Sequence, residues 1–119
     1  MKKLLRILPV FILCGTIIFG HADAYIDHQT AVVRVLNKAA GKAQTVRVPV
    51  GYSVSFEKLG ITARACKQTD PFDAENYFAF LEIFDAGADQ VFGGWMNRNE
   101  PGNNPLQNPD YDVWLVGCE

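Results

Sequence analysis

The sequence predicts an all-β protein, a small antiparallel β-sandwich or partly open barrel of about seven strands, preceded by a cleavable N-terminal signal helix. Two observations predict the strands. Short segments rich in valine, threonine and phenylalanine repeat with a period of two, and turns rich in glycine, proline and asparagine separate them. A third observation is a pair of cysteines, about 50 residues apart, of the kind that stabilises small exported domains.

The segment 1–24 has the three parts of a secretory signal peptide. Three basic residues lie among its first six positions, residues 7–19 are almost entirely apolar, and Ala-Asp-Ala at 22–24 matches a signal peptidase site. We expect cleavage after Ala24 and export to the periplasm. An uncleaved membrane anchor is the alternative, although the apolar run is shorter than the roughly 20 residues that a spanning helix needs.

The rest of the chain divides into a flexible leader at 25–30, which contains His28, and a single β domain at 31–119. The whole chain has a formal net charge of −2, and the signal segment holds three basic residues but only one acidic residue. Its removal therefore leaves a more acidic protein. An acidic domain is a poor partner for nucleic acid or for an anionic membrane surface.

Two strands are expected at the start of the β domain. Residues 30–36 alternate in the β-branched pattern of a strand, residues 37–42 form a hairpin turn, and residues 44–50 return with three valines on one face. Pro49 favours an edge position for the second strand, because proline cannot donate a hydrogen bond to a neighbouring strand.

Two further strands are expected at 53–57 and 61–66, so that the first four strands form a meander. The alternation within 61–66 places Cys66 on the face opposite Ile61. The polar segment 67–76, which contains a proline, follows as a loop. Its three carboxylates lack the spacing of a known calcium loop, so we expect no metal there.

The segment 77–86 is apolar on both faces, which predicts a central strand. A turn at 87–89 and a strand at 90–96 follow. Gly93 and Gly94 within that strand allow a close backbone approach or a bulge just before Trp95.

Residues 97–109 contain three prolines and five asparagines, which predicts a long irregular loop. The last strand begins at Tyr111. There we expect a structural role for Tyr111, burial of Trp114 in the core, and acceptance of loop N–H groups by the Asp112 carboxylate.

Cys66 and Cys118 remain after signal cleavage and are expected to form a disulfide. In the chain-entropy model, such a bridge stabilises the fold by about 4 kcal/mol. The alternative is a reactive or metal-binding thiol pair. However, neither cysteine has a neighbouring histidine in the sequence, and their spacing fits no zinc pattern.

Several motifs carry a resemblance to a known family. Gly-Trp-Met at 94–96, Tyr-Asp-Val-Trp-Leu at 111–115 and Cys118, together with the strands upstream, resemble the exported alphaproteobacterial proteins catalogued as domain of unknown function 2155. The likeness covers about 31–118. It implies an exported protein with the same fold, and it implies no activity, because the family has none assigned.

The sequence offers little for catalysis, and we expect that the protein is not an enzyme and binds no cofactor. A serine or cysteine nucleophile needs a base within hydrogen-bond reach. The only histidine after the signal segment, His28, lies in the leader. A carboxylate pair of Glu100 with Asp110 or Asp112 is the remaining alternative.

The function we expect is that of an accessory or interaction protein of the cell envelope, which presents the loop at 93–110 to a protein partner. The candidate binding residues are Trp95, Met96, Asn97, Asn99, Asn103 and Asn104. The alternative is a peptidoglycan-binding module in which Trp95 stacks on a sugar ring and asparagine amides bind its hydroxyls. A contiguous apolar patch of Trp95, Met96 and the loop would favour a protein, and a shallow groove rimmed by amides would favour a glycan.

Overall fold

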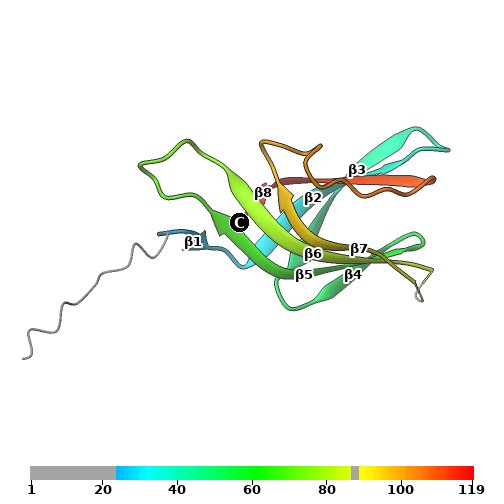
Figure 1. Cartoon of the computed structure of the whole chain (residues 1–119). Coiled ribbons are helices and arrows are strands. Elements are labelled where there is room, and N and C mark those ends of the chain that lie inside the picture. Colours follow the sequence, from blue (N-terminus) through cyan, green and yellow to red (C-terminus); the bar gives the residue numbers. More distant parts are fainter. Residues whose placement is uncertain (1–23, 87–88) are drawn as a thin grey trace, which may run out of the picture.

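A computed structural model describes residues 24–86 and 89–119, and these form two antiparallel β-sheets packed face to face (Figure 1). Apart from Ala24, the predicted signal segment lies outside the described residues, as do Gly87 and Ala88 of the predicted turn. In the part of the chain that the structure describes, no helix is long and apolar enough to cross a membrane.

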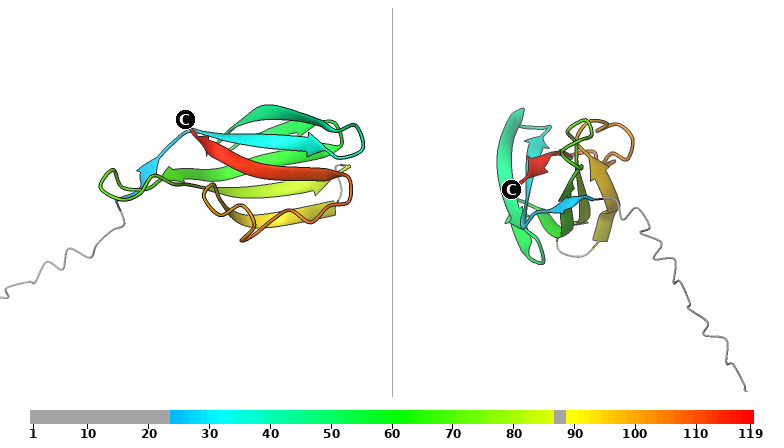
Figure 2. Two further views of the ribbon diagram at one scale, coloured as in Figure 1. Left: turned by 90° about the horizontal axis from the view of Figure 1, so that it is seen from above. Right: turned by 90° about the vertical axis from the view of Figure 1, so that its left-hand side faces the viewer.

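The larger sheet has five strands in the order β1-β5-β6-β7, and β4 pairs with β5 along the same edge as β1. Its strands are β1 (Ile26–Asp27), β4 (Ser53–Phe56), β5 (Leu59–Gln68), β6 (Tyr77–Asp85) and β7 (Asp89–Asn97). The smaller sheet has the order β3-β2-β8, with β2 (Thr30–Asn37), β3 (Lys42–Pro49) and β8 (Tyr111–Cys118). The views in Figure 2 show the two sheets as separate layers, not closed into a barrel. The predicted sandwich is confirmed.

The core lies between the sheets and follows from the alternation within each strand. β6 is central in the larger sheet, as predicted, and directs Ala79, Leu81 and Ile83 inward. β2 and β8 cover them from the smaller sheet with the alternate residues Ala31, Val33, Val35, Val113 and Leu115. Every second side chain of these strands therefore faces the opposite sheet.

The predicted meander is wrong, because the chain changes sheet between β3 and β4. The β2–β3 hairpin belongs to the smaller sheet, whereas β4 pairs with β5 in the larger one. Gly51 has a φ of 90° and donates its N–H to the carbonyl of Ala63 at 2.7 Å, next to a parallel bridge between Val50 and Ala63. β3 consequently remains an edge strand, which confirms the position predicted from Pro49.

The face predicted for Cys66 is also wrong. The register of β5 against β6 shifts between Ala63 and Ala65, so Arg64 is an extra residue in a β-bulge. One extra residue inverts the alternation that follows it, and Cys66 therefore faces the core on the same side as Ile61. Arg64 points to solvent and forms an ion pair with Glu82.

The segment 25–30, predicted as a flexible leader, is instead part of the fold, and its last residue, Thr30, already belongs to β2 of the smaller sheet. Ile26 and Asp27 pair with the end of β5 as strand β1. His28 donates its N–H to the carbonyl of Cys66 at 2.8 Å, and its ring Nε2 lies 2.8 Å from the Gln68 side-chain oxygen. His28 is therefore a half-buried part of the fold.

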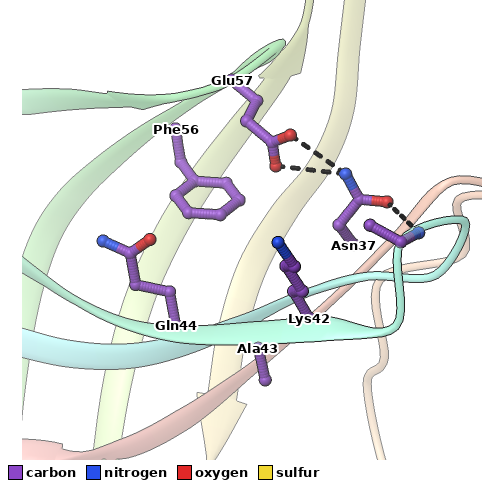
Figure 3. A pocket seen from close by; sticks show the side chains of 7 residues that line it. Asn37, Lys42, Ala43, Gln44, Phe56 and Glu57 are labelled. Atoms are coloured by element: carbon purple, nitrogen blue, oxygen red, sulfur yellow. Dashed lines mark hydrogen bonds between the residues drawn. The ribbon is translucent and has the colours of Figure 1, made fainter.

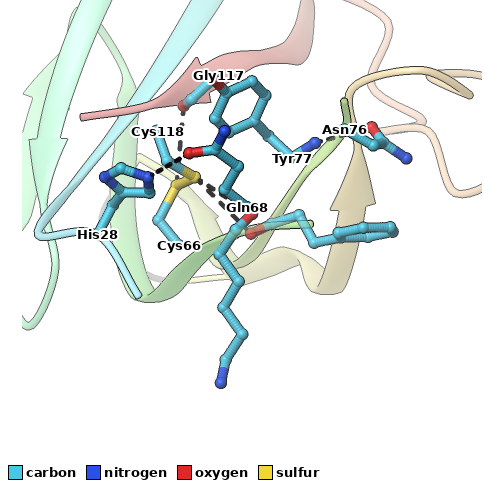
Figure 4. Close-up of a disulfide and its surroundings, with 9 residues drawn as sticks. His28, Cys66, Gln68, Asn76, Tyr77, Gly117 and Cys118 are labelled. Carbon is cyan, nitrogen blue, oxygen red and sulfur yellow. Dashed lines mark hydrogen bonds between the residues drawn. A yellow bond between two sulfur atoms is a disulfide. The ribbon is translucent and has the colours of Figure 1, made fainter. Parts of the chain in front are cut away.

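Cys66 and Cys118 form a disulfide, as predicted, with 5.7 Å between their Cα atoms (Figure 4). The bridge joins β5 of the larger sheet to the end of β8 in the smaller one. Both cysteines are buried. The disulfide thus ties the two layers together at one end of the sandwich.

Replacing both cysteines by alanine is expected to lower the free energy of unfolding by about 4 kcal/mol, because the unfolded chain regains the entropy of a loop that spans a sequence separation of 52. Denaturant unfolding of the oxidised wild type and of this variant measures the difference. Equal free energies of unfolding for the two proteins would contradict the stabilising role.

Candidate functional site

Trp95, a predicted binding residue, lies on the outer face of the larger sheet. It is 44% exposed and belongs to β7, shortly before the loop that follows this strand. Phe92 and Met96 of the same strand face the core. Its indole packs edge-on against Phe80 of the neighbouring strand β6, with ring centroids 5.4 Å apart. Trp95 is therefore accessible from outside, as a binding residue must be.

Aromatic side chains continue from Trp95 across β6 to Tyr25, the residue before β1. Phe78 and Phe80 alternate with the core residues of β6 and therefore face outward, half-buried. The ring of Tyr25, which is 42% exposed, packs edge-on against Phe78 at 5.9 Å. We call Tyr25, Phe78, Phe80 and Trp95 the aromatic face.

Met96 does not belong to this surface, contrary to its prediction as a binding residue. Strand alternation turns it inward next to Trp95, and it is only 5% exposed in the core. The apolar patch of Trp95, Met96 and the loop, which would have favoured a protein partner, therefore does not form. Trp95 instead shares its surface with residues of β6 and Tyr25.

The two glycines before Trp95 allow side chains to approach the strand closely, which was one of the two predicted roles. A Cβ atom at Gly94 would lie 2.9 Å from the side-chain nitrogen of Asn104, and one at Gly93 would collide with the Gln90 amide. The bulge in this strand lies earlier, where the register shifts beside Phe84. A larger residue at Gly94 would thus displace the Asn104 side chain.

The candidate asparagines mostly hold the loop in place. The Asn97 side-chain oxygen accepts hydrogen bonds from the Asn76 amide at 2.7 Å and from the backbone N–H of Asn99 at 3.0 Å. The Asn99 amide donates to the Glu75 carbonyl at 2.9 Å, and the Asn104 amide donates to the Trp95 carbonyl at 3.1 Å. Asn103 is exposed in a turn closed by its N–H and the Glu100 carbonyl.

Two loop residues that the sequence analysis did not single out are buried. Leu106 is 4% exposed and belongs to the core cluster, and Asn108 is 7% exposed. The Asn108 side-chain oxygen accepts the N–H groups of Asp110 at 2.9 Å and Tyr111 at 3.1 Å, and its amide donates to the Asp85 carboxylate at 3.2 Å. Asn108 thus has the role predicted for Asp112. The Asn-Pro-Asp turn signal could have identified it.

Trp114 is not a core residue, contrary to the prediction. In β8 the alternate residues Tyr111, Val113 and Leu115 are buried, so Asp112 and Trp114 between them point outward, where both are half-buried. Loop residues Pro101, Gly102 and Pro105 line a groove of about 360 Å³ with them. The two tryptophans therefore lie on the outer faces of different sheets.

A second polar cluster ties the loop to the segment before β6. The guanidinium of Arg98 lies 4.9 Å from the centroid of the Tyr77 ring and 3.4 Å from a Glu75 carboxylate oxygen. The Tyr77 hydroxyl donates to the same carboxylate at 3.0 Å, and this hydrogen bond raises the pKa of Tyr77. The cluster holds the two loops together. It could not be predicted from the sequence, because Arg98 is distant from Glu75 and Tyr77 along the chain and meets them only in the folded structure.

Within residues 24–86 and 89–119, no group of three or more histidine, cysteine, aspartate or glutamate side chains could hold a metal ion. The acidic loop between β5 and β6 is used differently: its Asp70 side chain accepts the N–H of Phe72 at 2.9 Å. Of the carboxylates considered for glycoside hydrolysis, Glu100 and Asp110 are exposed loop residues, and Asp112 is half-buried in β8.

The family model described as "uncharacterized protein conserved in bacteria (DUF2155)" matches residues 31–118. The matched region covers almost all of β2 to β8. No curated protein and no solved structure matches the chain.

Replacing Trp114 by alanine is expected to lower the free energy of unfolding by only about 1–2 kcal/mol, because the side chain is half-buried on an outer face. Leu115→Ala at the next position provides the matched core variant and should lower it by about 2–5 kcal/mol. Denaturant unfolding of both variants tests this order. A larger loss of unfolding free energy in Trp114→Ala than in Leu115→Ala would show that the indole is a core residue after all.

Asn108→Ala is expected to lower the free energy of unfolding by about 2–3 kcal/mol, because it leaves the N–H groups of Asp110 and Tyr111 without their acceptor. Asn103→Ala, in the exposed part of the same loop, is the control and should change stability by less than about 0.5 kcal/mol. Similar unfolding curves for the two variants would rule out the anchoring role of Asn108.

Proposed function

This chain belongs to the uncharacterised bacterial family whose model spans its β domain, and we propose that it is an accessory protein of the cell envelope that binds a protein partner through its aromatic face. The loop at 98–110 supports this surface from one side. It does so through the hydrogen bond from the Asn104 amide to the Trp95 carbonyl. This proposal keeps Trp95 as the central contact and replaces Met96 by Phe78, Phe80 and Tyr25.

The observation that carries the proposal is the exposed aromatic row on a rigid sheet. Trp95 and Tyr25 keep almost half of their surfaces in contact with water, and each packs against a phenylalanine of β6. Exposed, contiguous aromatic residues are typical of protein interfaces, where tryptophan and tyrosine contribute much of the binding energy. A β-sheet holds them in fixed positions, which lowers the entropic cost of binding.

The charges beside the aromatic face are paired with one another. Arg64 forms an ion pair with Glu82, and Lys67 with Asp27 at 3.2 Å. Exposed ion pairs contribute little to stability, but they leave no large single-sign field around the aromatic face. The partner surface that fits best is therefore apolar and weakly charged.

Export to the periplasm is part of the proposal. The disulfide supports it, because such bonds persist in oxidising compartments. The signal features in residues 1–24 support it independently. The proposal includes no catalytic step and no cofactor.

A glycan remains the second candidate, with a different site from the one first considered. Around Trp95 the Asn104 amide is already bound to the Trp95 carbonyl, which leaves it poorly placed to bind sugar hydroxyls. The groove beside Trp114 combines an indole, two proline rings and the Asp112 carboxylate. Aromatic rings and carboxylates are the groups that stack on sugars and accept their hydroxyls.

The test uses a photoreactive residue at position 95 in living cells, with the same residue at position 52 as control. Tyr52 is an exposed aromatic residue in the connection between β3 and β4, outside the aromatic face. We expect a specific protein to be captured at position 95 and not at position 52. The captured protein, once purified, should bind Trp95→Ala at least about tenfold more weakly than wild type and Tyr52→Ala equally well.

Trp95→Ala should keep the melting temperature close to that of the wild type, so that lost binding reflects the surface. Capture of glycan fragments alone, or equal binding of the wild type and Trp95→Ala, would refute a protein contact through the aromatic face. A loss of peptidoglycan binding in Trp114→Ala would then support the second candidate.

A further inference from the structure

The most exposed large apolar side chain of the described residues is Phe72, which is 98% exposed. It lies at the tip of the loop between β5 and β6, with Asp70 and Asp73 beside it. It belongs neither to the aromatic face nor to the loop at 98–110. A fully exposed phenylalanine contributes nothing to the packing of its own domain, and its whole ring is available to pack against another molecule.

The turn that carries Phe72 is held in one conformation by hydrogen bonds. The N–H of Asp73 donates to the Asp70 carbonyl, and the N–H of Phe72 donates to the Asp70 carboxylate, both at 2.9 Å. Thr69 and Asn76 close the base of the loop through two further bonds of 3.0 Å. Because the turn is already ordered, little entropy is lost when Phe72 is buried by a partner.

The opposite end of the sandwich carries an open crevice of about 560 Å³ between the β2–β3 hairpin and the end of β4. Figure 3 shows Lys42 and Gln44 pointing toward Phe56 and Glu57 across it. The Asn37 amide donates to both Glu57 carboxylate oxygens, at 3.0 and 3.3 Å, so that charge is already hydrogen-bonded. An apolar ring and an ammonium group thus face the same space.

Phe72 and the crevice of the same molecule cannot meet. Phe56 and Glu57 come just before β5, and the turn with Phe72 comes just after it. A strand of this length separates its ends by roughly 30 Å. Figure 1 shows the connection between β5 and β6 and the turn between β4 and β5 at opposite ends of the sheet. Only a second molecule can bring a Phe72 to this crevice.

We propose that the Asp70–Asp73 turn of one copy docks into the end crevice of a second copy. Phe72 packs against Phe56, and the turn carboxylates lie beside Lys42. The match is local: the turn places two carboxylates beside Phe72, and the crevice places the Lys42 ammonium beside Phe56. Glu57 is the one carboxylate of the crevice lining, and it is hydrogen-bonded to the Asn37 amide. Because the two surfaces differ, the contact is head-to-tail and can extend into a linear chain of copies.

The test measures the mass of the oxidised protein, purified from cells expressing the whole chain, by sedimentation over a wide concentration range. We expect the average mass to rise beyond that of a dimer. Phe72→Ser should weaken association at least about tenfold, whereas Tyr52→Ser, which removes an exposed aromatic residue elsewhere, should leave it unchanged. Trp95→Ala should also leave it unchanged, which separates this contact from the proposed envelope interface.

A charge exchange tests the orientation of the contact. Lys42→Glu should weaken association, Lys42→Arg should keep it, and Asp73→Lys in the same chain as Lys42→Glu should restore it. A mixture of Phe72→Ser with Lys42→Glu should stop at dimers, because one working crevice meets one working turn. A monomeric wild type at all concentrations, or unchanged association in Phe72→Ser, would overturn the proposal.

Discussion

The disulfide between Cys66 and Cys118 is the constraint on which the arrangement of the two sheets most depends. Core packing holds the sheets together, but apolar contacts are non-directional and do not by themselves fix which ends of two layers meet. The disulfide fixes one end, and the Val50–Ala63 bridge fixes the crossing from β3 to β4. The bulge at Arg64 is a precondition for the disulfide, because without it Cys66 would face solvent.

Much of the fold could be predicted from strand alternation, because each strand buries one face and exposes the other. The hairpin at 37–42, the edge position of β3 and the central position of β6 all followed from local pattern. The sheet to which each strand belongs could not be predicted, since Val46 and Val54 would be buried in either one. The bulges could not be predicted either, because a single extra residue such as Arg64 leaves no recognisable pattern in the sequence.

The candidate site was predicted less well, for a physical reason. Tryptophan and asparagine have side chains that suit ligands, but they suit the protein's own backbone equally, and only tertiary structure decides between them. Asn97, Asn99 and Asn104 bond within the protein, and Met96 lies in the core. The outward position of Trp114 was readable, because the alternation that buries Val113 and Leu115 excludes it from the core. The aromatic face could not be predicted without the register of β6 against β7, which places Phe80 opposite Trp95.

The pairing of β2 with β8 also determines when this domain can fold. It sets Ala31 opposite Cys118, so β2 cannot complete its pairing in the smaller sheet until β8 has been synthesised. Contacts so distant in sequence form slowly, because chain entropy opposes loop closure before any contact compensates for it. Until then, the β2–β3 hairpin has one edge without a partner and an uncovered apolar face, both of which promote aggregation. During synthesis, β2 is therefore the segment that a chaperone would most need to protect.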